Sequence, residues 1–191
     1  MQGARPLAPR EITRVLKSCQ GIREESLILI GINLGLRVSE LVTLKWRDVM
    51  HRNHVLPLLY LQKNSTKGKR PRGVPINSKV SKAILRLHRS QKLVCSLGPD
   101  NYLFSGGTKG HLSCRHINRL LYALFDRAGL GGKLSSHTLR KTFGTVLADR
   151  GINLAVIQEL LGHADISTTR KYIGVGMKNM QNAVNVLNNA F

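Results

Sequence analysis

Apolar positions recur at helical spacing along most of the chain. Residues 9–19 and 78–92 carry hydrophobic side chains three and four positions apart, which is the spacing of one face of an α-helix. Residues 22–35 are apolar on nearly all sides and end at Gly35, so we expect a buried helix that a glycine terminates. A short amphipathic helix is expected over residues 37–44.

The pattern becomes that of strands in the next part of the chain. Residues 54–62 are typical of a strand, and residues 73–76 are typical of a short returning strand. Between them, residues 63–72 are polar and rich in Lys and Arg, as in a turn. The segment therefore predicts a small antiparallel ribbon with a basic tip.

Helical spacing then resumes. Ser113 and either Ser135 or Ser136 are good N-cap candidates, and Gly151 is a suitable stop for the second of these helices. The expected helices of this part span residues 114–128, 136–150, 153–162 and 167–173. The predicted fold class is mainly α with a small antiparallel β-ribbon (α+β), in a single domain over residues 1–176.

The net charge narrows the class of partner. The chain has 30 Lys and Arg against 10 Asp and Glu, a net charge of +20, which favours a polyanion such as nucleic acid. A ribosomal protein would fit this charge equally well. Residues 45–92 hold 13 Lys and Arg and a single acid, Asp48, and such clustering favours phosphate contact. Aromatic residues make up only 5%, so double-stranded DNA is favoured over single strands stacked on aromatic rings. The expected DNA-contacting residues are Lys45, Lys69, Arg70, Arg72 and Lys141.

The remaining composition favours a cytoplasmic protein associated with DNA. The three cysteines are odd in number and far apart, which argues against a disulfide framework. The N-terminus lacks an apolar stretch of the secretory type, and the longest apolar run is too short to span a bilayer.

The acids do not form an obvious metal site. Only Glu24 and Glu25 are adjacent, and neighbouring residues on a helix face different directions. His111, Cys114 and His116 lack a complete four-ligand spacing, so no metal is expected. Metal-free chemistry on a phosphodiester would instead need Arg side chains, which match phosphate oxygens, and a side-chain nucleophile.

Several residues of the required types stand near predicted helix ends. His137 and Arg140 are three apart in the first turn of one helix, on a face opposite Leu139 and Phe143, where the helix dipole also favours an anion. Arg37 opens a short helix, and His163 follows a helix stop. Each of these features is common in proteins when taken alone.

Four ordered motifs together are specific. They are "GLRVSELVTLKW", "TKGKRPRGVPI", "SSHTLRKTFGT" and "LLGHADISTTRKYIGV". In order and spacing they resemble the catalytic domain of the tyrosine recombinase family, which includes phage integrases and Xer-type recombinases. The resemblance extends from about residue 7 to residue 191. It implies a site-specific DNA recombinase that cleaves and rejoins strands without metal, ATP or another cofactor.

The resemblance also implies roles for individual residues. Tyr172 is similar to the nucleophile that forms a 3′-phosphotyrosyl link, and Lys67 to the general acid that protonates the leaving 5′ oxygen. Lys69 and Arg70 are close enough in sequence to leave that second assignment open. The other implied site residues are Arg37 and Arg140 on the phosphate oxygens, His137 and His163 as the two histidines, and Glu40 as the acid that supports them.

The C-terminal residues 177–191 carry a separate apolar stripe. The stripe stands at three- and four-residue steps, which predicts a helix that needs a docking surface; its residues are Met177, Met180, Val184, Leu187 and Phe191. Docking onto the chain's own core is one possibility. The family resemblance implies docking onto a neighbouring protomer in a tetramer on paired DNA sites, with a monomer in free solution. Family members usually have an N-terminal DNA-clamping domain, which this chain lacks, so it is either a fragment or an unusually small integrase.

Three alternative functions remain at this point. A type IB topoisomerase shares similar chemistry, although the tail helix favours recombination. A DNA-binding regulator with an inactive site is a second alternative, although all six expected active-site positions are occupied. A basic structural RNA-binding protein would explain the charge but none of the four motifs.

Overall fold

The computed structural model describes residues 3–62, 71–94, 96–107 and 110–170. The elements, in chain order, are α1 (Pro9–Lys17), α2 (Ile22–Leu34), α3 (Val38–Val42), α4 (Trp46–Val49), β1 (Met50–His51), β2 (His54–Val55), β3 (Leu58–Leu61), β4 (Arg72–Pro75), α5 (Ser78–Lys92), α6 (Cys114–Arg127), α7 (Ser136–Asp149), α8 (Leu154–Leu161) and α9 (Ile166–Arg170). Helices dominate, and the strands form two small antiparallel pairs, β1–β2 and β3–β4. The predicted fold class is confirmed.

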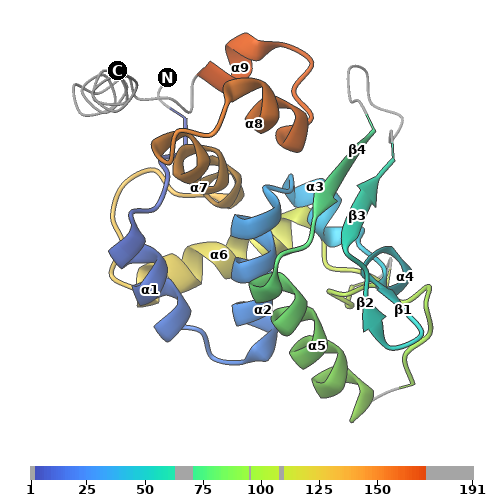
Figure 1. The fold of residues 1–191 in the computed structure, drawn as a ribbon. Helices are drawn as coiled ribbons and strands as arrows, with labels where there is room; N and C mark the ends of the chain where they lie inside the picture. Colours follow the sequence, from blue (N-terminus) through green and yellow to red (C-terminus); the bar gives the residue numbers. More distant parts are fainter. Residues whose placement is uncertain (1–2, 63–70, 95, 108–109, 171–191) are drawn as a thin grey trace.

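Helix α2 forms the centre of the core. It packs against α5 on one side and α7 on another (Figure 1). It is apolar nearly all round, and Leu27, Ile28, Ile30 and Leu34 are all 1% exposed or less. Gly35 terminates it in the left-handed conformation, with φ of 59°, as the sequence predicts.

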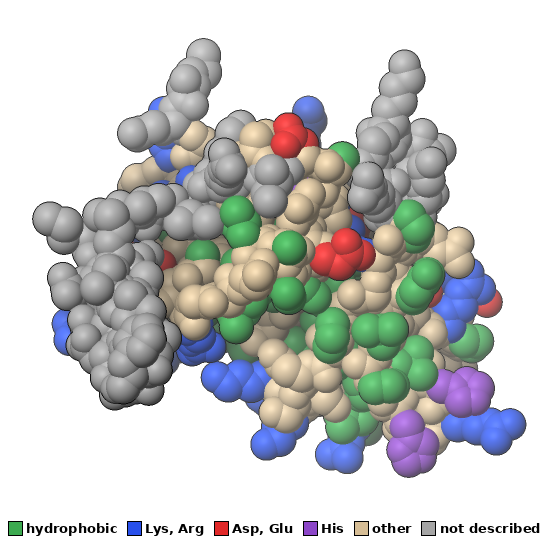
Figure 2. All heavy atoms as spheres, turned by 45° about the horizontal axis from the view of Figure 1, so that its top comes forward, with side chains coloured by type: hydrophobic (Ala, Val, Ile, Leu, Met, Phe, Trp, Pro, Cys, Tyr) green, Lys and Arg blue, Asp and Glu red, His purple; other side chains and the backbone are tan. Residues whose placement is uncertain are grey.

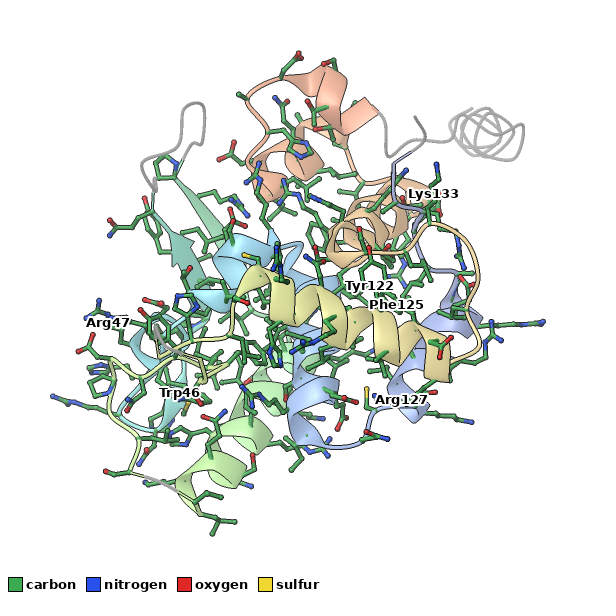
Figure 3. All side chains as sticks on the ribbon, turned by 180° about the vertical axis from the view of Figure 1, so that it is seen from behind. Trp46, Arg47, Tyr122, Phe125, Arg127 and Lys133 are labelled. Atoms are coloured by element: carbon green, nitrogen blue, oxygen red, sulfur yellow. The ribbon has the colours of Figure 1, made fainter. Side chains whose placement is uncertain are left out.

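Helix α6 covers the back of the core, with a capped start and one apolar face (Figure 3). Ser113 caps it by accepting a hydrogen bond from the His116 amide. Phe125 is buried, whereas Tyr122 on the outer side is 54% exposed. The sequence predicts both the cap and the buried face, because apolar residues recur three and four positions apart and so line one side of the helix.

The β3–β4 ribbon differs from the sequence prediction at one point. The single strand expected over residues 54–62 is interrupted at Pro57, so that β2 ends at Val55 and β3 begins at Leu58. Proline has no backbone N–H to donate to a strand ladder, although its carbonyl accepts a hydrogen bond from the Ile76 amide at 2.8 Å. The ribbon itself pairs Leu58 with Pro75 and Leu61 with Arg72.

A short hairpin and a short helix were not predicted. Strands β1 and β2 are joined by Arg52 and Asn53, with φ of 45° and 68°. Positive φ at both central residues is the geometry of a tight hairpin turn. Glycine commonly provides that geometry, and without a glycine the residue pattern does not indicate the turn. Helix α4 has a single turn, which is too short for a periodic pattern.

The ends of several elements meet in one region. Helices α8 and α9 lie together above α7 and α3, and β4 rises beside them (Figure 1). A small second core of Phe143, Ile157 and Leu161 holds α8 against α7. Among the described residues, no helix has both the length and the apolar character that crossing a bilayer requires.

Candidate active site

Helix α7 begins with a capping arrangement that fixes its first turn. The Ser135 hydroxyl accepts from the His137 amide at 3.2 Å, and the Thr138 hydroxyl accepts from the Ser135 amide at 3.0 Å. His137 is exposed in this turn, whereas Arg140, three residues later, is only 3% exposed. The two residues predicted to share a face therefore differ in environment, because Arg140 turns toward α2 and α8.

Two glycines allow α7 to approach α2 closely. A Cβ atom added at Gly31 would lie 2.6 Å from Cδ1 of Leu139, and one added at Gly35 would lie 2.5 Å from the ring of Phe143. A side chain at either position would overlap α7 unless Leu139 or Phe143 moved, so glycine is the residue that fits without such a shift. The approach brings Nη1 of Arg140 to 2.7 Å from the Gly35 carbonyl oxygen, at the carboxyl end of α2.

The carboxyl end of α8 is surrounded by guanidinium groups. Three consecutive carbonyls there each accept a hydrogen bond from a different arginine. The pairs are Arg72 Nε to Leu160 O at 2.8 Å, Arg140 Nη2 to Leu161 O at 2.6 Å and Arg37 Nη2 to Gly162 O at 3.4 Å. The last carbonyls of a helix have no partner within the helix and carry partial negative charge. They therefore hold three positive groups at one place.

Glu40 orders two of these arginines. Its Oε1 accepts from Nη1 of Arg72 at 3.0 Å and from Nη1 of Arg37 at 3.1 Å. Its Oε2 accepts from Nη2 of Arg72 at 2.9 Å and from the Arg37 amide at 2.7 Å, which also caps α3. Burial alone would raise the pKa of Glu40, but the hydrogen bonds and charges of Arg72 and Arg37 lower it to about 2. Glu40 is therefore a carboxylate at neutral pH.

His163 follows the C-cap residue of α8, Gly162, and is held from both sides. Its amide donates to the Gln158 carbonyl at 3.1 Å, and its own carbonyl accepts from the Gln158 side chain at 3.1 Å. Its Nδ1 lies 2.7 Å from the hydroxyl of Thr169 on α9, so the ring is fixed against the next helix. The imidazole is thus placed beside the carbonyls that bind the arginines.

Burial and the arginines together determine the charge of His163. Burial lowers the pKa of the imidazole most, and the positive charges of Arg140, Arg37 and Arg72 lower it further, to about 4. His163 is therefore neutral at pH 7. Three guanidiniums against one carboxylate leave a local excess of positive charge, which is suited to an anion.

The positive charge of this region is recessed. The side chains of Arg72 and Arg140 are almost completely buried, while that of Arg37 is 25% exposed. In the space-filling view, the visible Lys and Arg side chains stand mainly around the rim of the face, and hydrophobic and neutral groups occupy much of its middle (Figure 2). Charges in a recessed, less hydrated position act more strongly on an incoming phosphate than charges on open surface.

The structure corrects the prediction for Arg72. The sequence assigns it to DNA contact with the other cations of residues 45–92, but its side chain is 2% exposed and paired with Glu40. The strand period explains the difference, since Arg72 lies two residues before the buried Val74 and therefore on the same, inward face of β4.

Lys45 and Lys141 are on or near the surface. The Lys45 ammonium is 3.2 Å from a carboxylate oxygen of Asp100, which also pairs with Arg47 at 2.5 Å. Arg47 is seen below the β3–β4 ribbon, away from α8 and α9 (Figure 3). Lys141 follows Arg140 on α7 and is half-buried. Both remain predictions for DNA contact.

Four predicted residues lie outside the described part of the chain. They are Lys67, Lys69, Arg70 and Tyr172. The predicted C-terminal helix of residues 177–191 also lies outside it. Within the described ranges, no group of three or more His, Cys, Asp or Glu side chains is arranged to hold a metal ion.

Comparison with known proteins gives the family. A model of the phage integrase family matches residues 6–179. The chain belongs to the phage integrase family. A tyrosine recombinase of Pseudothermotoga lettingae is 32% identical over 182 residues, which cover 95% of this chain and 60% of that protein.

Solved structures of two recombinases share the fold of this integrase-family chain. The crystal structure of XerA recombinase matches with a TM-score of 0.79 and 24% identity, over 97% of this chain and 65% of that one. XerH bound to a palindromic difH substrate in a post-cleavage complex matches with a TM-score of 0.73 and 21% identity, over 98% of this chain and 54% of that one. The chain thus spans between about half and two thirds of these proteins.

Proposed function

We propose that the chain is the catalytic part of a site-specific DNA recombinase that cleaves and rejoins double-stranded DNA through a 3′-phosphotyrosyl intermediate. One observation carries the proposal. Arg37, the N-cap of α3, and Arg140 of α7 are more than 100 residues apart in sequence. They donate to the adjacent carbonyls of Leu161 and Gly162 at the end of α8, immediately before a buried, neutral histidine. This arrangement suits one phosphate group, and a related recombinase has been solved with its DNA substrate.

The proposed reaction uses these groups in a defined way. The Tyr172 phenolate attacks phosphorus, the bond to the 5′ oxygen breaks, and Lys67 donates a proton to that oxygen. Negative charge accumulates on the phosphate oxygens as phosphorus becomes five-coordinate, and the Arg37 and Arg140 guanidiniums stabilise it there. His163 hydrogen-bonds a phosphate oxygen, and His137 handles protons. The tyrosyl ester retains the energy of the phosphodiester, so a 5′ hydroxyl of another strand can reverse the step without ATP.

The surroundings of the site have proposed roles as well. Lys45, Lys69, Arg70 and Lys141 contact the DNA backbone. Residues 177–191 dock onto a neighbouring protomer and build a tetramer on paired sites. The working environment is the DNA of the cytoplasm.

A covalent-trapping assay tests this proposal. Nicked duplexes from the native genomic surroundings are incubated with the protein without metal or ATP, and adducts are separated on a denaturing gel. We expect a slowly migrating protein–DNA adduct that Tyr172→Phe abolishes, while Tyr172→Phe keeps nearly unchanged DNA affinity because one hydroxyl adds little to many phosphate contacts. An equally abundant adduct from the Tyr172→Phe protein would refute the nucleophile.

A further inference from the structure

Arg72 uses its guanidinium for buried hydrogen bonds within the protein, and not for contact with a partner at the surface. Its guanidinium forms two parallel hydrogen bonds with Glu40, at 3.0 and 2.9 Å, and its Nε donates to the Leu160 carbonyl at 2.8 Å. The side chain is 2% exposed. Arg72 is the first residue of β4, so it joins the ribbon to both α3 and the carboxyl end of α8.

The contact with Glu40 extends to Arg37. Each Glu40 oxygen accepts from both arginines, and the Arg37 bonds, at 3.1 Å to the guanidinium and 2.7 Å to the amide, fix the residue at side chain and backbone. A shift of the Arg72 fork would rotate the carboxylate and release one or both of these bonds. The orientation of Arg37 therefore depends on Arg72.

The contact with α8 extends to His163. A Cβ atom added at Gly162 would lie 2.9 Å from Cδ of Arg72, so the arginine side chain lies directly against the backbone that leads into His163. The positive φ of Gly162, 61°, lets the chain turn there. Arg72 thus contacts the two segments that carry Arg37 and His163.

Stability alone does not account for a buried pair of this kind. Replacing a buried ion pair with well-packed apolar groups is often neutral or stabilising, because taking charges out of water is costly. The two-point Arg–carboxylate fork, however, fixes direction in a way that a lysine or an apolar side chain cannot. Orientation is the property that this pair supplies.

We propose that Arg72 is a positioning residue, which sets the Arg37 guanidinium in register with His163 so that both meet one phosphate. This inference rests on the proposed function. Arg72 itself contacts neither DNA nor the reacting atoms. It acts through Glu40 and through the end of α8.

The first test compares Arg72→Lys with the unchanged protein in single-turnover adduct formation. Lysine keeps the charge but loses the fork, so we expect cleavage to slow on the order of 10²-fold, the effect of a misplacement of about 1 Å, with DNA affinity nearly unchanged. Arg5→Lys is the control for the loss of a two-point arginine–carboxylate contact as such, at a more exposed position where the Arg5 side chain is 34% exposed. Arg5 makes the same two-point contact, with Glu11 at 2.8 and 2.8 Å, and its Nε also donates to a backbone carbonyl, that of Gly131. The Arg5→Lys protein should cleave at the normal rate.

A sulfur-bridged substrate separates positioning of the phosphate from positioning of the general acid. When sulfur replaces the 5′ bridging oxygen, the P–S bond breaks and the 5′ thiolate leaves without needing a proton. We expect the Arg72→Lys defect to persist on this substrate, whereas Lys67→Ala should recover. Recovery of Arg72→Lys would mean that Arg72 acts on the leaving group, and would overturn the proposal.

A double substitution tests the link to Arg37. If Arg72 acts through Arg37, the rate losses of Arg37→Lys and Arg72→Lys should combine to less than their product. Independent, multiplying losses would overturn the proposal. Should Arg72→Lys fail to fold, Glu40→Gln provides the same comparison from the other side of the pair.

The failure of this inference is distinct from the failure of the proposed function. If the unchanged protein forms no adduct on any duplex, the recombinase reaction itself is refuted. If the unchanged protein forms the adduct and Arg72→Lys forms it equally fast, only the role of Arg72 is refuted.

Discussion

At the scale of one residue, His163 shows how the surroundings of a side chain set its protonation state. Three neighbouring guanidiniums are held by backbone carbonyls and by one carboxylate. Their positive charge, added to burial, favours the neutral form of the His163 imidazole. Its pKa of about 4 lies well below the ordinary 6.5. A neutral imidazole can hydrogen-bond a phosphate oxygen without adding a fourth positive charge to a crowded site.

The pKa of His163 predicts a pH dependence of folding. Between pH 6.5 and 4 the unfolded chain binds a proton at this residue that the folded chain does not, so stability is full above pH 6.5 and declines as pH falls toward 4. Urea unfolding of the DNA-free protein at several pH values measures this, and His163→Gln should lessen the decline in that window. An identical pH slope in the two proteins would contradict the assignment. Glu40 acts mainly in a lower window, because its pKa falls from the ordinary 4.5 to about 2 on folding, so its stabilising effect is lost as pH falls from 4.5 toward 2.

At this scale, the sequence predicts a site residue where residue type and motif spacing agree. Residue type and motif spacing indicated Arg37, Glu40, Arg140 and His163, and the structure brings these four together around the end of α8. The prediction of DNA contact for Arg72 is wrong, because the number of charges along the chain does not tell which side of a strand each cation faces. Thr169, which contacts His163, was missed, since a threonine in a polar run carries no distinctive signal.

At the scale of elements, the approach of α2 to α7 positions the site. Gly31 and Gly35 are one helical turn apart and face Leu139 and Phe143, which are also one turn apart. Close approach at these two levels brings Arg140 within reach of the carboxyl ends of both α2 and α8. The helix pair therefore positions the arginine.

Gly35→Ala tests this arrangement. The left-handed backbone costs a non-glycine residue about 1 to 3 kcal/mol, and the overlap with Phe143 adds ~1 to 3 kcal/mol. Gly129 is the matched control, because its φ of 64° is similar and nothing lies within 4 Å of an added Cβ. Urea unfolding should show a larger loss for Gly35→Ala than for Gly129→Ala, with slower cleavage only in the former. Equal losses would mean that the α2–α7 contact does not constrain Arg140.

The elements were easier to predict than their junctions. Long amphipathic or apolar helices such as α5 and α2 follow from periodicity, and caps at Ser113 and Ser135 follow from residue type. The β1–β2 hairpin and the break at Pro57 depend on backbone geometry over two or three residues, which a hydrophobic pattern does not encode.

At the scale of the whole molecule, the net positive charge of the chain and the buried charges of the site have different effects. The net charge of +20 favours DNA at long range, in a way that salt screens. The guanidiniums of Arg72 and Arg140 are buried, and their position is set by helix ends. Salt should therefore weaken DNA binding much more than it weakens the contacts within the site.

Truncation before Met177 tests the proposed assembly. If residues 177–191 dock onto a neighbouring protomer, the truncated protein should keep the thermal midpoint of the full chain but lose higher-order complexes with DNA, because the apolar stripe no longer has a partner. Sedimentation with and without DNA, alongside thermal unfolding, measures both effects. A truncated protein that is unfolded would instead support docking onto the chain's own core.

The central claim is that guanidiniums gathered at the end of α8 neutralise charge on the scissile phosphate. The most direct measurement compares adduct formation by the unchanged protein and by Arg140→Ala on two duplexes, one with the normal phosphate and one with an uncharged methylphosphonate at the cleavage site. Thermal unfolding confirms that both proteins are folded. We predict that Arg140→Ala is severely impaired on the phosphate and far less impaired on the methylphosphonate, because the charge that Arg140 stabilises is gone. Equal impairment on both substrates would contradict the claim.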